Sequence, residues 1–384
     1  MSLVTHGAWR RWAAVAVGVL ALCLLPVVLA ALPAAPVRIE PGLLRERILT
    51  SAGVPYQGYV DTRGAILLPD VPAIREVAQL VRGTRLRTWY SAPDAWRVAI
   101  LETTGERDIY RTATGTYMWD FERSLTTVTL GDLPVRLPTA ADLLPPDLAR
   151  RLLADERAVT GLGGRRVAGV DAAGLRMVPA DPDTTIGWID VWADPRSGLP
   201  LQVEVGQRGA RDPVFTTRFL DVDQRAPAAT LLVPQVPASA GLTVTTADEV
   251  AAAVNAAVPA ELPATLAGRA RQGAGPVPRV AGLAAYGSGA SMVVLLALPG
   301  RTGFDALVRA RDRGGQPVPL DRAEAYEASA GLVNGLIVRT LGDRRVRRTY
   351  VLAGPVAPAV LRQAAAELVA AAYAAPESIT VTPR

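Results

Sequence analysis

The stretch that decides the fold is residues 85–122, RLRTWYSAPDAWRVAILETTGERDIYRTATGTYMWDFE. Polar and apolar residues alternate in four short runs, and turn-forming residues separate these runs at 91–94, 104–106 and 114–115. Alternation with period two, interrupted by a turn about every ten residues, is typical of an antiparallel meander. The stretch therefore predicts four consecutive strands of one sheet.

Two of these runs carry aromatic side chains on one face. In the second run that face holds Trp96, Val98 and Ile100, and in the fourth it holds Tyr117, Trp119 and Phe121. A face of this kind has to be covered, because apolar area left in water costs free energy. Whether protein or a bound ligand forms the cover is the functional question for this chain.

The remainder of residues 41–228 adds strands and few helices. Helical spacing of apolar residues predicts short helices within 41–57, 72–81 and 139–158, against about ten strands in all. So few helices can cover only one face of a large sheet. More apolar side chains are then present than the helices can cover, and this predicts a ligand cavity between sheet and helices. The expected lining is Trp89, Trp96, Val98, Ile100, Tyr117, Trp119, Phe121, Trp188 and Trp192. The alternative is that the same side chains are ordinary core.

The amino terminus carries an apolar segment. Residues 13–32 are uncharged and follow Arg10 and Arg11, and at helical rise they span roughly 30 Å, the thickness of a hydrocarbon core. The segment is either a membrane anchor, which we favour, or a cleaved signal peptide that leaves a secreted protein. In both cases the arginines hold residues 1–12 in the cytoplasm, so that the bulk of the chain, after a stalk at 33–40, is extracytoplasmic.

A change of composition divides the rest of the chain. Residues 229–280 are rich in Pro, Ala and Gly and are interpreted as a linker, 281–376 as a small α+β domain of three or four strands ending in a helix, and 377–384 as a tail. The densest charge cluster consists of Arg344, Arg345, Arg347 and Arg348. It is either a solvated edge strand that avoids unwanted pairing or a contact for acidic lipid head groups or an acidic partner.

Catalytic chemistry is not expected. The sole histidine, His6, precedes the apolar segment and the sole cysteine, Cys23, lies within it, which excludes Ser-His-Asp and Cys-His sites in the outer domains. Residues 161–164, GLGG, lack the lysine of a phosphate loop and are interpreted as a hairpin turn. We expect no metal and no cofactor. A net charge of +5 over 384 residues is smaller than the positive charge typical of a nucleic-acid-binding protein.

Three stretches resemble the fold shared by the lipoprotein carrier LolA and the sigma-factor regulators of the MucB/RseB type. They are Tyr56-Gln57-Gly58, residues 87–98 and residues 188–201, where a strand, a D-x-x-x-G-L-P turn and a returning strand are the most specific feature. A second small domain is similar to RseB and not to LolA. All 41 basic residues are arginine, which is typical of a high-GC genome such as an actinobacterial one.

The resemblance implies a curved antiparallel half-barrel covered by helices, followed by a small α+β domain. It also implies that the concave side takes an acyl chain or a lipidated partner, and that RseB-like members hold a membrane-bound anti-sigma factor in check. The sequence therefore predicts a non-catalytic, membrane-tethered extracytoplasmic protein that binds an acyl lipid or lipoprotein and acts as an envelope sensor or regulator. The alternatives are a LolA-like carrier of lipids or lipoproteins and a structural envelope protein.

Overall fold

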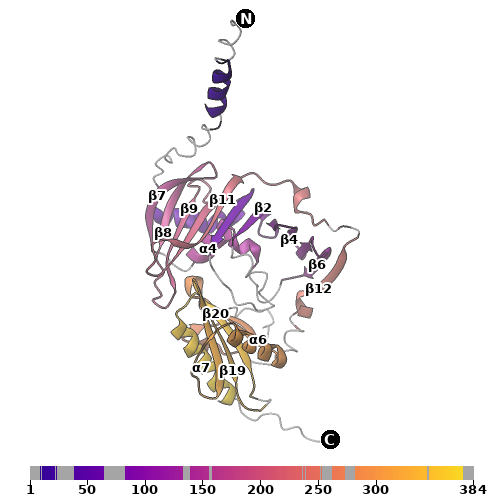
Figure 1. Ribbon diagram of the computed structural model, residues 1–384, viewed down its shortest axis with the longest axis vertical. Coiled ribbons are helices and arrows are strands. Elements are labelled where there is room, and N and C mark those ends of the chain that lie inside the picture. The colour runs from indigo at the N-terminus through magenta and orange to yellow at the C-terminus, as the bar shows by residue number, and fades with distance from the viewer. Residues whose placement is uncertain are drawn as a thin grey trace.

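The protein is an α+β protein with two large sheets, one of twelve and one of six strands, and a further two-stranded sheet (Figure 1). The computed structural model describes residues 39–64, 83–132, 139–154, 158–235, 237, 239–250, 252, 262–272, 282–343 and 346–374, together with 9, 11–21 and 23. Residues 11–21 are helical. In the described part of the chain no helix is long and apolar enough to cross a membrane, and the predicted span 13–32 is described only at 13–21 and 23.

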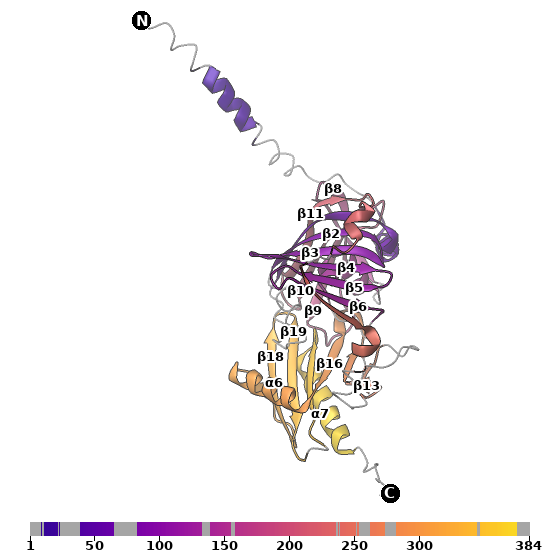
Figure 2. The ribbon, with the colours of Figure 1, turned by 90° about the vertical axis from the view of Figure 1, so that its right-hand side faces the viewer.

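The large sheet contains the predicted meander. Its strand order is β12-β6-β5-β4-β3-β2-β1-β11-β10-β9-β8-β7, and Figure 2 shows β11 and β2 to β6 one after another. The strands are β1 (Tyr56–Gly64), β2 (Thr84–Ala92), β3 (Ala95–Leu101), β4 (Glu106–Thr112), β5 (Gly115–Asp120), β6 (Leu125–Leu130), β7 (Val159–Val167), β8 (Val170–Met177), β9 (Ile186–Ala193), β10 (Pro200–Gln207), β11 (Pro213–Asp223) and β12 (Gly241–Thr246). Every neighbouring pair is antiparallel except β12 and β6, which run parallel.

Short helices cover one face of this sheet, here called the helix face. They are α2 (Pro41–Thr50), η1 (Ser51–Gly53), η3 (Ala140–Leu143) and α4 (Pro145–Leu153). Glu40 caps α2 by accepting a hydrogen bond from the Leu43 N–H, and a proline opens each α-helix, where its missing N–H costs nothing. Leu44 and Ile48 of α2 and Leu153 of α4 are fully buried against β8 to β11. The predicted helix at 72–81 lies outside the described residues.

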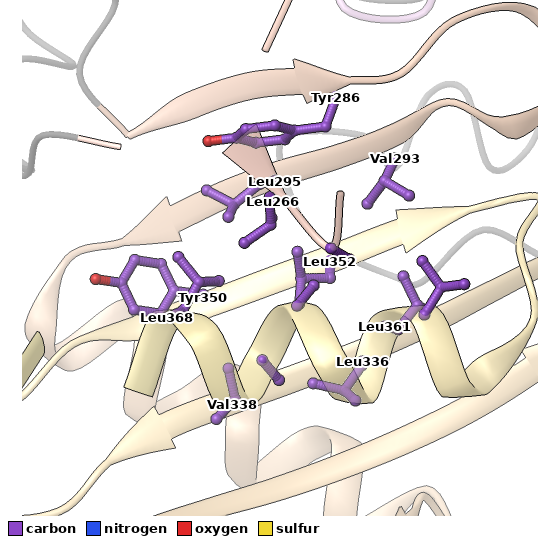
Figure 3. Packing of buried hydrophobic residues seen from close by; sticks show 14 of the residues in the cluster. Leu266, Tyr286, Val293, Leu295, Leu336, Val338, Tyr350, Leu352, Leu361 and Leu368 are labelled. Carbon is purple, nitrogen blue, oxygen red and sulfur yellow. The ribbon is translucent and has the colours of Figure 1, made fainter. Parts of the chain in front are cut away.

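The six-stranded sheet is larger than the three or four strands that the sequence predicts. Its order is β15-β16-β20-β19-β18-β17, and its elements are β15 (Leu283–Tyr286), β16 (Val293–Leu298), α6 (Gly300–Asp312), β17 (Gln316–Pro317), β18 (Ala323–Ala330), β19 (Val333–Thr340), β20 (Thr349–Gly354) and α7 (Pro358–Ala374). The predicted C-terminal helix is α7, whose Leu361 and Leu368 pack with Leu295 and Leu352 on one core (Figure 3). β15 and β17 are too short for alternation to be recognised in the sequence.

The region interpreted as a linker contributes a strand to the large sheet and core residues to the small domain. After β11 the chain forms η4 (Ala229–Leu232) and then β12, at the edge of the large sheet opposite β7 (Figure 1). Further on, β13 (Thr265–Leu266) and β14 (Arg269–Ala270) form a hairpin, and Leu262 and Leu266 are buried in the core of the small domain. A Pro- and Gly-rich composition therefore does not prevent these residues from pairing and packing.

The two sheets are joined at the turn between β8 and β9. The hydroxyl of Thr184, buried at 2% exposure, donates to the Ala290 and Pro355 carbonyls, and Thr185 N–H donates to Pro355 O over 3.0 Å. Arg269 of β14 reaches back to Asp181, with 3.1 Å between guanidinium nitrogen and carboxylate oxygen. Apart from the Nε of Arg269, which has no hydrogen-bond partner in the described part of the chain, these polar groups are paired across the joint, so that separating the two parts would leave buried groups unpaired.

Candidate functional site

The predicted cavity residues are distributed over both faces of the large sheet. Trp96, Val98 and Ile100 of β3 lie on the helix face and pack with the core there. By strand register, five of the others point to the opposite face, here called the far face: Trp89, Tyr117, Trp119, Trp188 and Trp192. The sequence placed Trp96 and Trp119 in one cavity, whereas the structure puts the sheet between them.

Two tryptophans of β9 lie flat on the far face because each faces a glycine across the ladder. Trp188 pairs with Gly206 and Trp192 with Gly174, and an added Cβ would come within 2.0 Å and 2.7 Å of the respective ring atoms. An arginine covers the ring face that points away from the sheet. The guanidinium of Arg176 lies 4.7 Å from the ring centroid of Trp188, and that of Arg165 lies 3.7 Å from the ring centroid of Trp192. Each indole is held between backbone and guanidinium, an arrangement that cation–π attraction favours.

Trp89 of β2 is held in a similar way near the middle of the sheet. The guanidinium of Arg97 lies 4.5 Å from its ring centroid and 5.1 Å from that of Tyr110. Arg97 also forms a bidentate ion pair with Asp108, at 2.8 and 2.9 Å, and a contact of 3.2 Å with Glu106. Burial, together with the neighbouring Asp108 carboxylate, raises the pKa of Glu106. Two carboxylates thus neutralise this arginine, which leaves no charge for a ligand.

The remaining predicted residues do not form a common site. Tyr117 and Trp119 are half-buried on β5, while Phe121 follows that strand and is exposed. In the predicted basic cluster, Arg344 and Arg345 lie outside the described residues. Arg347 is exposed and donates to the Gly342 carbonyl over 2.6 Å, and the Arg348 N–H donates to Thr340. That cluster and the cavity both stay predictions.

A pocket of about 540 Å³ opens on the far face where β7 curls back over β11 and β10. Within the described residues, its lining consists of Arg63, Arg165, Arg166, Val167, Ala168, Gln202, Glu204, Thr216, Arg218, Phe219 and Leu220. The lining combines four guanidinium groups with one carboxylate. A concave site with such an excess of positive charge attracts anions, because low-dielectric walls strengthen the field inside it.

The four pocket arginines differ in how much of their charge is neutralised. Arg63 pairs with Asp61 at 2.8 Å and Arg166 with Asp171 at 3.0 Å. Arg165 contacts Glu204 at 2.6 Å, but Glu204 also accepts a hydrogen bond from the buried Gln202 amide. Arg218 is half-buried, and its side chain forms no ion pair or hydrogen bond with any other described residue. Its guanidinium is therefore available to a ligand.

A tight hairpin positions one wall of the pocket. Ala168 and Gly169 connect β7 to β8 with φ of +49° and +80°, the left-handed values of a type I′ turn. The interpretation of residues 161–164 as the hairpin turn is wrong, because these residues lie within β7 and form an irregularity in its pairing with β8. The extra residues bend β7, as bulges do, and carry Arg165 and Arg166 over β10 and β11.

Planar guanidinium groups recognise phosphate and carboxylate groups through paired hydrogen bonds, so the pocket is suited to an anionic head group. Within the part of the chain that the structure describes, no cluster of three His, Cys, Asp or Glu residues could hold a metal ion. Sequence reasoning missed the pocket, although the adjacent pair Arg165-Arg166 was visible. Its other arginines, Arg63 and Arg218, are about 100 and about 50 residues away along the chain.

Known proteins are similar to this chain in structure and not in sequence. No protein-family model matches, and no curated protein sequence matches. The structure of the Pseudomonas aeruginosa MucA/MucB complex superposes with a TM-score of 0.49 at 16% identity, covering 85% of this chain and 97% of the other. The chain is similar in fold to MucB. Free MucB gives a TM-score of 0.45 at 16% identity over 86% of this chain and 98% of the other.

A LolA superfamily protein from Nitrosomonas europaea covers 51% of this chain and 99% of its own length, with a TM-score of 0.25 at 14% identity. The match to MucB covers 85% of this chain, and the match to the LolA superfamily protein covers 51%. The two-domain order expected from the sequence stays a prediction. The lineage expected from the composition stays a prediction.

Proposed function

We propose that this chain is a non-catalytic, extracytoplasmic binding protein that holds the anionic head group of a lipid or lipidated partner in the arginine pocket. The observation that carries the proposal is the charge balance of that pocket, with four guanidinium groups and one carboxylate. Arg218 and Arg165 are the two arginines we expect to contact the head group. Beside them, the exposed Leu220 offers apolar surface to the first part of an acyl chain.

The proposed ligand differs in one respect from the expectation drawn from the sequence. An acyl chain buried between sheet and helices would need apolar space there, and the helix face is instead packed with Leu44, Ile48 and Leu153 at 0% exposure. Recognition through a phosphate head group requires only the charged pocket, with the chain lying along the surface. Lipid binding and the membrane anchor both remain part of this proposal.

We further propose that ligand binding is sensed by a protein partner, as in an RseB-like regulator of a membrane-bound anti-sigma factor. The resemblance of residues 188–201 to the RseB fold suggests the kind of partner. The strand β9 supports a sensor, because it begins at the joint between the sheets and ends with Trp192 beneath Arg165. A LolA-like carrier is the alternative, and it would transfer lipid between vesicles without any protein partner.

Lysophosphatidic acid, which combines one phosphate with one acyl chain, is the probe that tests the head-group proposal. We expect saturable binding to the full chain in detergent, no comparable binding of monoacylglycerol, and at least tenfold weaker binding of lysophosphatidic acid to the Arg218→Met variant, a loss of about 1.4 kcal/mol. Arg85→Met is the matched control. Arg85 and Arg218 flank the same residue, Asp61, on adjacent strands, but Arg85 does not line the pocket.

Three outcomes separate the alternatives. Equal binding of monoacylglycerol would show that the acyl chain is recognised and the head group is not. Equal binding of an acidic peptide such as hexaglutamate, with no preference for lysophosphatidic acid, would replace the lipid by a protein segment. Transfer of the lipid between vesicles at a rate unaffected by a candidate partner would favour the carrier.

A further inference from the structure

Among the described residues, nothing pairs with the outer edge of the large sheet at β12. β6 pairs with one side of β12 over six residues, from Gly241 opposite Leu125 to Thr246 opposite Leu130. No described segment pairs with the other side, where β12 ends the strand order. The unpaired N–H and C=O groups of an edge strand form a template on which another strand can pair.

β12 lacks the features that protect edge strands. Its sequence, GLTVTT, contains no charged residue and no proline, and its pairing with β6 has no register shift. The opposite edge, β7, carries Arg165-Arg166 and an irregular pairing with β8. In the small sheet, β17 has two residues and one of them is Pro317, while β15 is bridged by Arg271. Among the described edges, β12 is therefore the one suited to pairing.

An apolar strip runs beside the open edge. Leu242 and Val244 of β12 and Leu130 of β6 are 58%, 54% and 36% exposed. The register aligns Val244 with Val128 and Thr246 with Leu130, so that all three side chains point to the far face. A strand added to β12 would place every second side chain next to this strip.

We propose that β12 is a strand-addition site for an extended segment of a partner protein, about six uncharged residues with an apolar side chain at every second position. Backbone hydrogen bonds to β12 would supply affinity, and contacts with Leu242 and Val244 would select the apolar positions. This is the edge-strand mode of peptide recognition. The inference does not depend on the arginine pocket, since β12 contributes no residue to it.

A flexible segment fits this edge better than a second copy of the chain does. Six paired residues extend over only about 20 Å, and two rigid sheets meeting along that line would bury less than the roughly 1,200 Å² that stable protein interfaces need. A flexible segment is not limited in this way. It can form hydrogen bonds with the unpaired N–H and C=O groups of β12, and its side chains can pack against the apolar strip.

The test uses a fluorescein-labelled peptide with the sequence of residues 125–130, LTTVTL, which is uncharged, has apolar side chains at two of the three alternate positions 126, 128 and 130, and is the sequence that β12 already pairs with on its other side. Fluorescence anisotropy with the full chain should show saturable binding. Val244→Lys puts a charge at the edge and should weaken binding at least tenfold. Val178→Lys is the matched control, because Val178 is 56% exposed and lies outside β6 and β12. Circular dichroism checks that both variants fold.

Backbone pairing is tested separately by methylating alternate amide nitrogens of the peptide, which removes donors without changing its side chains. We expect one of the two alternating patterns to abolish binding. Equal binding to the wild type and the Val244→Lys variant, or equal binding of both methylated peptides and the parent, would overturn the proposal. Self-association of the chain that Val244→Lys removes would assign the edge to a second copy and would also overturn it.

Discussion

Arg97 and Arg165 both lie over a tryptophan ring on the far face, yet their surroundings differ. Arg97 stacks on Trp89 and is held by Asp108 and Glu106, so that two carboxylates surround one cation. Arg165 stacks on Trp192, and its one carboxylate, Glu204, is the sole acidic group among the described residues that line a pocket with four arginines. We therefore expect the same contact to be structural where the charge is balanced and to take part in binding where it is not.

The largest effect is expected on the balanced side. Arg97→Met should lower the free energy of unfolding by about 3 kcal/mol, since Asp108, at 5% exposure, would lose its partner inside the protein. Urea denaturation measures this change. Affinity for lysophosphatidic acid should be unchanged, and a loss of both stability and affinity would show that the two arginines do not have separate roles.

Arg165→Met should have the opposite profile. Its side chain is 42% exposed, so solvent screens the pair with Glu204 and the loss of stability should stay near or below about 1 kcal/mol. Affinity for lysophosphatidic acid should fall about tenfold, which titration of the probe measures. Unchanged affinity would leave Arg218 as the ligand contact and would break the comparison with Arg97.

Glu204→Gln should sharpen the contrast by removing the carboxylate of the pocket. The neutral amide oxygen can still accept the hydrogen bond that Gln202 donates over 2.6 Å. Arg165 then has no competing anion, and we expect the affinity for lysophosphatidic acid to rise about threefold, or about 0.7 kcal/mol. The gain should shrink with added salt, because it is electrostatic. Weaker binding would mean that Glu204 positions Arg165.

The smallest effect concerns the acidic pair at Arg97. The pKa of Glu106 is raised from 4.5 by burial and by Asp108, so the folded protein takes up this proton more readily than the unfolded chain. The resulting stability is fully present below the unfolded value of 4.5 and is lost as pH rises through the raised folded pKa. Because the Glu106 side chain is 42% exposed, solvent keeps the effect below about 1 kcal/mol.

Glu106→Gln should remove this pH dependence. Urea denaturation of both proteins between pH 4 and 7 measures it as a difference in slope. A slope that is unchanged in the variant would assign the pH dependence to other carboxylates.

Alternation was enough to predict the meander, because the side chains of residues two apart in a strand share a face wherever that strand pairs. Residues 95–101 and 115–120 are strands, as expected. Alternation does not say which of two faces the helices will cover. Trp96 and Trp119 were placed together for that reason, and the pairing through β4 puts them on opposite faces.

The pocket could not be predicted, because its charge balance depends on contacts between distant residues. Arg63, Arg165 and Arg218 come from β1, β7 and β11, and each of these strands alone has an unremarkable charge pattern. The bend in β7 and its turn at Ala168 and Gly169 bring them together. A similar limit applied to β12, where the Pro- and Gly-rich surroundings indicated a linker.

The sequence by itself determined the alternating strands, the turns between them and the lack of histidine and cysteine beyond the apolar segment, since these are properties of neighbouring residues and of composition. Within the part of the chain that the structure describes, the tertiary structure decided which face each tryptophan occupies, which arginine retains an uncompensated charge and which strand edge has no neighbour. These features depend on register and on the curl of the sheet. Both are set by hydrogen bonds between segments far apart in the chain, where a shift of one residue reverses every side chain.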